Sequence, residues 1–258
     1  MTSRRQAPRL RPGRIESWLL DRVKRSGTLC AALVDPEDFT LSEAAAVASA
    51  SQRAGVSSIL VGGSTIADQR QLDSVVRRIK KAVRCPVILF PGNITGVSPY
   101  ADAILFSSLL NSTNPYFIIG AQALGALKVY KSELESIPMG YLVFGNTSST
   151  SFVGQTNGIP FDKPGLAVMY SLAAQYLGMR TLYLEAGSGS LETVPQETIK
   201  TIRKHYGGFL IVGGGITSQE RARETSQAGA DMIVVGNLLK KDGFERILEN
   251  IVQGIRHR

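Results

Sequence analysis

The sequence predicts a single (β/α)₈ barrel, or TIM barrel, in which eight parallel strands alternate with helices. Three observations favour this fold class: eight short apolar segments recur along the chain, helical patterns fill most of the gaps between them, and glycine-rich turns follow the last two segments. The length of 258 residues is usual for one such barrel. An open doubly wound sheet is the structural alternative, and it is less favoured because no G-x-G-x-x-G motif follows the first strand.

The eight predicted strands are short runs rich in Val, Ile, Leu and Phe, as expected for strands that are buried on both faces. Most of them are bounded by Gly, Pro, Asn or Ser, which favour turns. They cover residues 28–34, 58–61, 87–90, 103–106, 140–144, 181–184, 209–212 and 232–235.

Helical patterns lie between or after these strands, over residues 42–54, 69–82, 167–177, 193–205, 218–228 and 244–255. In the first of them Ser42 is the expected N-cap. A further helix over residues 15–24 precedes the first strand and places Ile15, Trp18 and Leu19 on one face. We expect that helix to close the floor of the barrel.

Two connections depart from the regular pattern. Between the third and fourth strands, residues 91–102 hold two prolines and two glycines and leave no room for the crossover helix that parallel neighbours normally need. Either a shortened helix or loop fills this place, or a wall element is missing and a groove runs along the side of the barrel. After the fifth strand, the polar stretch 145–165 has the length of loops that are functional or mobile.

The composition predicts a cytoplasmic protein whose core needs no disulfide or structural metal. The two cysteines, Cys30 and Cys85, lie in apolar runs and are expected to be buried thiols, and no Cys/His cluster could hold zinc. No apolar run reaches the ~18 residues of a membrane-spanning helix, and the N-terminus lacks the apolar core of a secretory signal. We expect one domain over residues 15–258.

The formal net charge of +8 is partly due to residues 1–14. That segment contains five arginines and no acidic residue, so we expect a disordered, solvated tail. Attraction to an anionic membrane surface, as a transient contact, or to a polyanionic substrate is the alternative. The other basic residues are scattered and form no recognisable nucleic-acid-binding motif, so nucleic acid is not an expected partner.

The candidate site lies at the carboxyl ends of the strands, where barrel enzymes carry their active sites. A triple glycine at 213–215 follows the seventh strand and precedes a helix, and Gly236 and Asn237 follow the eighth strand. Glycine lets the backbone approach a ligand closely, and a turn that enters a helix offers unpaired N–H donors to an anion. Two such turns, in the strand positions where barrel phosphate sites form, predict phosphate binding.

Glu185, at the end of the sixth strand, is the candidate base. Strand alternation points Tyr183 and Glu185 in the same direction and Leu184 toward the outer layer. The carboxylate could accept hydrogen bonds from a polyol or take a proton from a hydroxyl; otherwise it is a rim glutamate paired with Lys or Arg. Because His205 and His257 lie in predicted helices far from any strand end, a carboxylate is the better candidate base.

A candidate metal site lies at the first two strands. Asp35 directly follows the first strand, and Ser64 follows the second. A carboxylate and a hydroxyl, completed by substrate phosphate oxygens and water, form a reasonable incomplete shell for Mg²⁺. Asp35 could equally be a turn residue before Pro36, and spacing alone leaves both readings open.

Taken together, these motifs resemble the geranylgeranylglyceryl phosphate synthase family, which also includes the bacterial heptaprenylglyceryl phosphate synthases. The matching segments are residues 33–37, 61–64, 183–189, 213–216 and 236–237. They span all eight strands in order, and the segment Tyr-Leu-Glu-Ala-Gly-Ser-Gly at 183–189 is the most specific. The short connection after the third strand also fits, because family members lack a normal helix there and lay the prenyl chain along that side.

The resemblance implies transfer of a geranylgeranyl or similar polyprenyl group from its diphosphate to the 3-hydroxyl of sn-glycerol 1-phosphate, a reaction of ether-lipid and phospholipid biosynthesis. It implies that glycerol phosphate binds to Tyr183, Leu184, Glu185, Ala186, Gly187, Ser188, Gly189, Gly214, Gly215, Gly236 and Asn237. It further implies that Glu185, with Tyr183, orients and deprotonates the attacking hydroxyl, and that Asp35 and Ser64 hold the Mg²⁺ that neutralises the departing diphosphate. A homo-oligomer, dimer or hexamer, is also expected.

The chain departs from part of the family at Leu33, because some bacterial members carry Lys two residues before the strand-one aspartate. This places it with the larger, mostly archaeal and Bacteroidetes-like branch, which uses geranylgeranyl chains. Two alternatives remain: another phosphate-binding barrel of the synthase or isomerase type, and a non-catalytic barrel that binds a metabolite or lipid. The predicted strands contain no Lys, which argues against Schiff-base chemistry, and the presence of Asp35 and Glu185 argues against a decayed enzyme.

Overall fold

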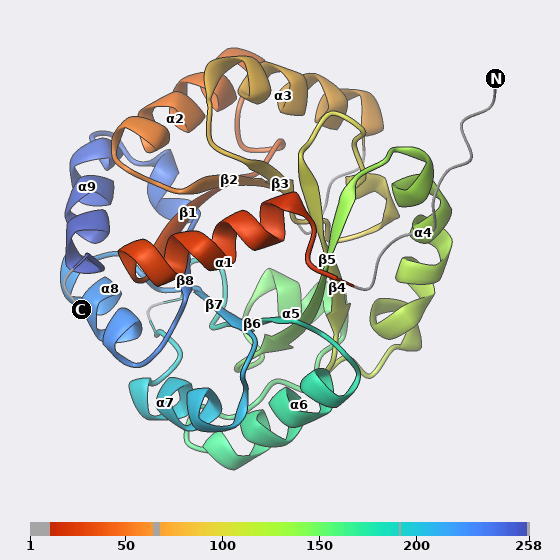
Figure 1. The fold of residues 1–258 in the computed structure, drawn as a ribbon, viewed down its shortest axis with the longest axis vertical. Helices are drawn as coiled ribbons and strands as arrows, with labels where there is room; N and C mark the ends of the chain where they lie inside the picture. The colour runs from red at the N-terminus through yellow and green to blue at the C-terminus, as the bar shows by residue number, and fades with distance from the viewer. Residues whose placement is uncertain (1–10, 64–67, 191, 257–258) are drawn as a thin grey trace.

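The computed structural model describes residues 11–63, 68–190 and 192–256, and within them eight parallel strands form a closed barrel (Figure 1). The strands are β1 (Leu29–Val34), β2 (Ser58–Val61), β3 (Val87–Leu89), β4 (Ala103–Leu109), β5 (Glu135–Val143), β6 (Thr181–Glu185), β7 (Phe209–Gly213) and β8 (Met232–Val235). Each strand pairs with its neighbours in chain order, and β8 closes the barrel by pairing with β1. The predicted TIM barrel is confirmed.

Helices surround the barrel (Figure 1). The α-helices are α1 (Arg14–Ser26), α2 (Leu41–Arg53), α3 (Gln69–Ala82), α4 (Ala121–Lys131), α5 (Ser149–Gly154), α6 (Pro164–Tyr176), α7 (Gln196–His205), α8 (Gln219–Gln227) and α9 (Phe244–Gly254). Shorter helical turns are η1 (Ile94–Gly96), η2 (Tyr116–Gly120) and η3 (Asn237–Lys240). Within the described ranges, no helix is long and apolar enough to cross a membrane.

The predicted N-cap of α2 was wrong by two residues. Thr40 caps the helix: its hydroxyl accepts the N–H of Glu43 at 3.3 Å, and the Glu43 carboxylate accepts the N–H of Thr40 at 2.8 Å. This reciprocal pair is a capping box. Ser42 lies inside the first turn because it has no partner three residues later that could complete such a pair.

Further elements differ from the prediction. α5 lies in the stretch 145–165 that was expected to be a loop, and β4 ends at Leu109 rather than at residue 106. β5 begins at Glu135, five residues before the predicted start, because the polar residues and Pro138 in its first half hide the strand pattern. α4 is absent from the predicted helices. Its sequence, AQALGALKVYK, has no continuous polar face, so the amphipathic period that identifies a surface helix is missing.

The core consists of two layers. Side chains that point into the barrel, such as Leu60, Ile88 and Met139, pack together and against α1. Side chains of the opposite strand face, such as Ile59 and Leu142, pack against the surrounding helices. The alternation follows from the two-residue period of a strand, and it makes the barrel a filled core rather than a pore.

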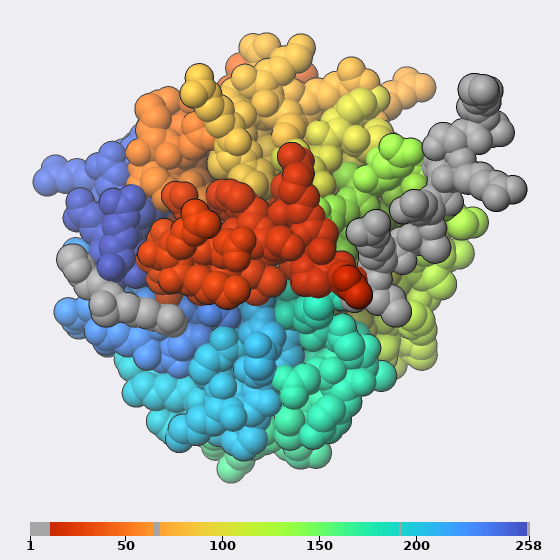
Figure 2. Space-filling view, viewed as in Figure 1, coloured from red at the N-terminus to blue at the C-terminus, as the bar shows by residue number. Residues whose placement is uncertain are grey.

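Helix α1 closes the floor of the barrel, as predicted. Ile15 and Leu19 are buried against the inner layer, and α1 lies across this end of the molecule (Figures 1 and 2). The Glu135 carboxylate accepts the N–H groups of Ile15 at 2.8 Å and Glu16 at 2.7 Å, so the start of β5 caps the helix. The buried Glu16 forms a bidentate ion pair with Arg180, at 2.7 and 2.8 Å.

The connection from β3 to β4 lacks a crossover helix, as predicted. The single turn of η1 stands in its place. The expected tail over residues 1–14 overlaps little with the described residues, and Arg14 already belongs to α1. Among the described residues, the barrel wall therefore lacks a full helix between β3 and β4.

Candidate active site

The carboxyl ends of the strands meet at the end of the barrel opposite α1, and the glycine turns after β6, β7 and β8 lie together there. Glu185, the last residue of β6, is paired in register with Gly213 of β7. The Ser188 hydroxyl donates to the Asn237 side-chain oxygen at 3.1 Å, which links the β6 and β8 turns. The sequence segments predicted to bind glycerol phosphate are therefore brought together.

The turn after β7 can be made only by glycine. Gly214 and Gly215 have φ angles of +85° and +69°, which L side chains rarely adopt. A Cβ atom at Gly214 would lie 2.8 Å from Glu185 Oε1 and 2.9 Å from the Ala186 nitrogen. The α8 helix starts directly after this turn, with Ser218 as its N-cap, so the turn has the form of an anion site at a helix N-terminus.

Arg221 of α8 supports the same turn. Its Nη1 donates to the Gly215 carbonyl at 2.8 Å, and its backbone N–H donates to the Ser218 hydroxyl at 3.3 Å. The guanidinium thus fixes the backbone of the turn.

Glu185 is buried in the floor of this site, with 7% of its surface exposed. Its Oε1 accepts the N–H of Gly187 at 2.7 Å, and its Oε2 accepts the hydroxyl of Tyr141 at 3.4 Å. Burial raises the pKa of the Glu185 carboxyl above its ordinary value, and the hydrogen bonds from Gly187, Tyr183 and Tyr141 partly offset this. A carboxylate with a raised pKa is a better proton acceptor than an exposed one.

Tyr183 points into the barrel beside Glu185, as strand alternation predicted, and Leu184 packs in the outer layer. The Tyr183 hydroxyl lies over the β7 backbone, where a Cβ at Gly213 would be 2.0 Å from it. Burial, with the negative charge of Glu185 beside it, raises the pKa of Tyr183 well above its usual value. The hydroxyl therefore remains a donor to the carboxylate.

Two aromatic side chains of the site were not predicted from the sequence. Tyr141 of β5 and Phe90, which follows β3, form a cluster with Tyr183, with ring centroids 5.0 to 5.5 Å apart. Tyr141 is paired in register with Tyr183. Both residues lie in predicted strands, over residues 87–90 and 140–144, but the strand pattern does not distinguish an aromatic residue of the site from one of the core.

Asp35 lies half-buried at the end of β1. Its Oδ1 accepts the N–H of Glu37 at 3.0 Å, and a Cβ at Gly63 would be 2.1 Å from its Oδ2, so the carboxylate fits against the glycine turn after β2. Burial raises its pKa, and the charges of Asp38 and Glu37 add to this effect. Ser64, the second predicted metal ligand, lies outside the described residues.

This arrangement fits a magnesium ion that takes few ligands from the protein. Within the described ranges, no group of three or more His, Cys, Asp or Glu residues could hold a metal by itself. Mg²⁺ commonly uses one or two carboxylates together with water and substrate phosphate oxygens. Asp35 offers one such carboxylate, in a place where neighbouring negative charges favour a cation.

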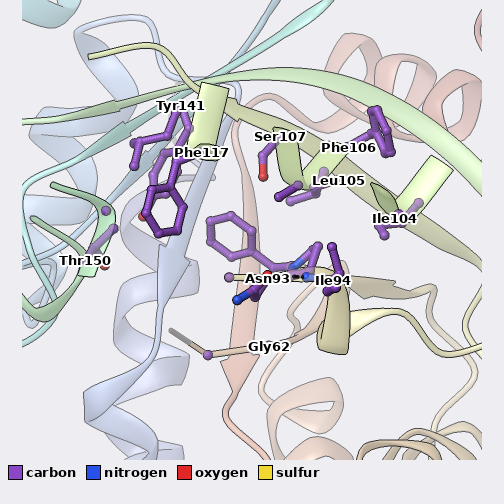
Figure 3. Close-up of a pocket in the computed structure, with 18 of the residues that line it drawn as sticks. Gly62, Asn93, Ile94, Ile104, Leu105, Phe106, Ser107, Phe117, Tyr141 and Thr150 are labelled. Carbon is purple, nitrogen blue, oxygen red and sulfur yellow. Dashed lines mark hydrogen bonds between the residues drawn. The ribbon is translucent and has the colours of Figure 1, made fainter. Parts of the chain in front are cut away.

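A cavity of about 190 Å³ connects Asp35 and Glu185 with the incomplete wall. It passes between β3, β4 and α4. Its lining there is mostly apolar and includes Ile94, Val97, Ile104, Phe106, Gly125 and Val129. Figure 3 shows Ile94, Ile104 and Phe106 on one side of this cavity and Phe117, Tyr141 and Thr150 on the other.

The apolar channel runs through the place where the predicted crossover helix is missing. Ile104 belongs to the outward face of β4 and packs in the outer layer, so the channel leaves the barrel interior between the strands and α4. Gly96, one of the two glycines in the connection between β3 and β4, does not line the cavity. A Cβ at Gly96 would meet Pro91 at 2.6 Å, so this glycine shapes the loop itself.

Comparisons with known proteins agree with this geometry. The PcrB family model matches residues 23–255. The geranylgeranylglyceryl phosphate synthase of Nitrosopumilus maritimus (strain SCM1) is 50% identical over 243 residues, which cover 94% of this chain and 97% of that relative. A crystal structure of (S)-3-O-geranylgeranylglyceryl phosphate synthase from Thermoplasma acidophilum, in complex with its substrate sn-glycerol-1-phosphate, has a TM-score of 0.89 and 38% identity and covers 93% of this chain and 98% of that chain.

More distant structures share only the architecture. A thiamine phosphate pyrophosphorylase from Pyrococcus furiosus has a TM-score of 0.58 and 12% identity, and it covers 90% of this chain and 97% of that chain. At this identity the likeness shows the barrel fold alone.

Proposed function

The chain belongs to the PcrB family and is a homologue of geranylgeranylglyceryl phosphate synthases, and we propose that it is a prenyltransferase that joins a geranylgeranyl or similar polyprenyl group to the 3-hydroxyl of sn-glycerol 1-phosphate. The products are an ether-linked prenylglyceryl phosphate and diphosphate. The observation that carries this proposal is a single cavity with a buried carboxylate and glycine turns at one end and an apolar channel at the other.

Glycerol phosphate would bind at the β6, β7 and β8 turns. Gly214, Gly215, Gly236 and Asn237 would hold the phosphate, and the segment 183–189 would hold the glycerol. Support comes from the close backbone approach at Gly214 and from the start of α8 behind the turn. This assignment leaves the 3-hydroxyl of the substrate facing Glu185.

Glu185 would accept the proton of the 3-hydroxyl. The new bond forms between that oxygen and C1 of the prenyl group, the bond from C1 to the diphosphate oxygen breaks, and the diphosphate leaves with the electron pair. Tyr183 and Tyr141 donate hydrogen bonds to the carboxylate and so orient it. The faces of Tyr141 and Phe90 would also stabilise positive charge at the allylic carbon.

Asp35, with Ser64, would hold a Mg²⁺ ion. When bound, the ion would neutralise charge on the departing diphosphate. The half-buried carboxylate and its negative neighbours support this assignment. The apolar channel lined by Val97, Ile104 and Val129 would hold the prenyl tail, and each CH₂ buried there contributes about 0.8 kcal/mol. The cytoplasmic location and the homo-oligomer remain predictions.

A turnover assay tests the proposal. Purified protein is incubated with radiolabelled sn-glycerol 1-phosphate, Mg²⁺ and prenyl diphosphates of 10 to 35 carbons, and the lipid product is extracted. We expect label in an ether-linked prenylglyceryl phosphate. Gly214→Ala serves as the matched variant, because a Cβ there would clash with Glu185 and weaken glycerol phosphate binding. Absence of lipid product with every chain length would overturn the proposal.

A further inference from the structure

A second cavity lies at the floor of the barrel, at the end opposite Glu185. The end of α1, the start of β1, the turn between α2 and β2 and the end of α9 enclose it (Figure 1). Its volume of about 560 Å³ lies within the range of ~300–1,000 Å³ that is usual for small-molecule sites. Strand β1 runs from this cavity at Leu29 to Asp35, and at ~3.3 Å per residue it places Asp35 roughly 20 Å away. The cavity is therefore separate from the candidate active site.

The charge on the lining of this cavity has one sign. Arg22 and Arg25 of α1 and Arg256, which follows α9, line it, and the other described lining residues are neutral. A cavity lined by charges of one sign raises the local concentration of counterions. The planar guanidinium group matches the oxygen geometry of phosphate. The hydroxyl-bearing residues Ser26, Thr28 and Ser57 also line the cavity.

The described carboxylates near the barrel floor already have other partners. Their ion pairs are Glu16–Arg180, Asp21–Lys24 and Asp231–Arg203. By contrast, none of the three lining arginines forms an ion pair within the described residues. The protein part described by the structure therefore leaves the positive charge of the cavity without a neutralising side chain.

The ends of two helices offset part of this charge. α1 and α9 both end at the cavity, and each helix C-terminus carries about half a negative charge. The two ends together balance roughly one of the three positive charges, so that about two remain. The remaining charge is complementary to an anion that carries at least two negative charges.

Neighbouring residues position two of the guanidinium groups. Gly55 has a φ angle of +100°, and a Cβ there would lie 3.0 Å from Nη2 of Arg256. The glycine thus lets the guanidinium lie directly against the turn between α2 and β2. The guanidinium of Arg22 lies 5.8 Å from the ring centroid of Trp18, as in a cation–π contact. Both charges are therefore held at the cavity before a ligand arrives.

We propose that this cavity, which we call the floor site, binds an anion that carries two or more negative charges on phosphate groups. A free anion, such as inorganic diphosphate, and a lipid headgroup with a phosphate monoester share this chemistry. The floor site does not depend on the proposed function, because its residues lie outside the glycine turns and the apolar channel.

Calorimetric titration with inorganic diphosphate in metal-free buffer tests the floor site. The proteins are the wild type, Arg25→Gln/Arg256→Gln and the control Arg223→Gln/Arg246→Gln, which removes the same charge from exposed positions of α8 and α9 outside the cavity. We expect a Kd of about 10–100 µM for the wild type and the control. In Arg25→Gln/Arg256→Gln the Kd should rise at least about tenfold, because two charge-assisted contacts are lost. A wild-type Kd above about 5 mM, or equal weakening in both double variants, overturns the floor site.

Chemical modification locates the site without a substitution, so it decides even if a variant fails to fold. Phenylglyoxal modifies exposed arginines of the wild type, and mass spectrometry maps the modified positions. With diphosphate at ten times its Kd, modification of the three lining arginines should slow about tenfold, since only the free protein reacts. Arg223 and Arg246 should react at unchanged rates. Equal rates at the lining arginines with and without diphosphate contradict binding there.

Sedimentation with vesicles distinguishes the two sources of phosphate. The vesicles consist of phosphatidylcholine with or without phosphatidic acid. If the wild type and the control sediment only with phosphatidic acid, and Arg25→Gln/Arg256→Gln does not, the ligand is a lipid headgroup. Diphosphate binding without sedimentation assigns the floor site to a free anion. A wild type that binds diphosphate at the floor but forms no prenyl product would contradict the proposed function and leave the floor site intact.

Discussion

Glu185 combines deep burial with hydrogen-bond partners that are all neutral. The described partners of its carboxylate are the Gly187 N–H and the hydroxyls of Tyr183 and Tyr141. A buried carboxylate that had a cationic partner would have a lowered pKa, whereas burial with neutral donors leaves the Glu185 pKa raised. The residue therefore costs stability when it is charged, which is typical of a group kept for its chemistry.

We predict that Glu185→Gln keeps the fold and glycerol phosphate binding but loses most turnover. Removal of a general base typically costs about 10²–10⁴ in rate. Steady-state kcat, together with calorimetric titration of glycerol phosphate, measures both effects. A kcat close to that of the wild type would show that Glu185 is not the base.

The raised pKa of Glu185 also predicts how stability depends on pH. Because the folded-state pKa lies above the unfolded value, the penalty of the charged carboxylate is fully present above the folded pKa and disappears as pH falls below the unfolded one. Glu185→Gln should therefore have a higher Tm than the wild type at pH 8, and this difference should vanish near pH 4. Tm measured by scanning calorimetry across this range provides the test, and a difference that is independent of pH would contradict the assignment.

Asp35→Ala should abolish the dependence of turnover on Mg²⁺ and change glycerol phosphate affinity little. The proposed metal site and the proposed phosphate site are separate, because Asp35 follows β1 whereas the phosphate turns follow β6, β7 and β8. The matched control is Asp38→Asn, which removes a nearby carboxylate that pairs with Lys240. Titration calorimetry that showed lost glycerol phosphate binding in Asp35→Ala would refute the two-site arrangement.

Two helices illustrate how elements depend on distant residues. α1 begins after Gly13, which offers no capping side chain, and it receives its cap from Glu135 on β5. α4 has a glycine, Gly125, at the position where it borders the apolar channel. Each helix thus has a glycine that is locally unfavourable for helix stability, and a segment distant in sequence accounts for its presence.

Glu135→Ala should destabilise the protein by removing the cap of α1. Loss of a helix N-cap costs about 0.5–2 kcal/mol, which for a chain of this size lowers Tm by roughly 2–6 °C. Glu135→Gln is the control, because it keeps an acceptor oxygen without the charge and should lose less. Thermal denaturation followed by circular dichroism measures the Tm of both variants. Equal Tm values for Glu135→Ala and the wild type would show that the Glu135 cap does not stabilise α1.

Gly125→Leu should shift the preference of the enzyme toward shorter prenyl chains. A Cβ at Gly125 would meet only Ile94, at an ordinary contact distance of 3.8 Å, so a larger side chain can enter the channel without disturbing the helix. Gly125→Ala is the graded control, and as an interior helix substitution it should stabilise by about 1 kcal/mol. The ratio of kcat/KM for C20 and C10 diphosphates is the readout. An unchanged ratio in Gly125→Leu would place the prenyl tail elsewhere.

At the scale of the whole molecule, the barrel brings together residues that are far apart in the chain. Asp35 and Glu185 are separated by 150 positions yet line one cavity. The position of Tyr141 level with Tyr183 depends on the β5–β6 register.

Strand periodicity and glycine turns were sufficient to predict which end of the barrel carries the site, because every parallel strand ends at the same side. They were not sufficient to identify Tyr141 and Phe90, since an aromatic residue in a strand is usually core.

The sequence by itself determined the fold class, the order and approximate positions of the eight strands, the floor helix and the incomplete wall after β3. These depend on local periods, on turn residues and on the length of a connection, and all of them can be read along the chain. The tertiary structure alone decided the cap of α1 by Glu135, the aromatic cluster beside Glu185 and the course of the apolar channel past Gly125. Each of these is a contact, or a lack of contact, between segments distant in sequence, and no local pattern contains that information.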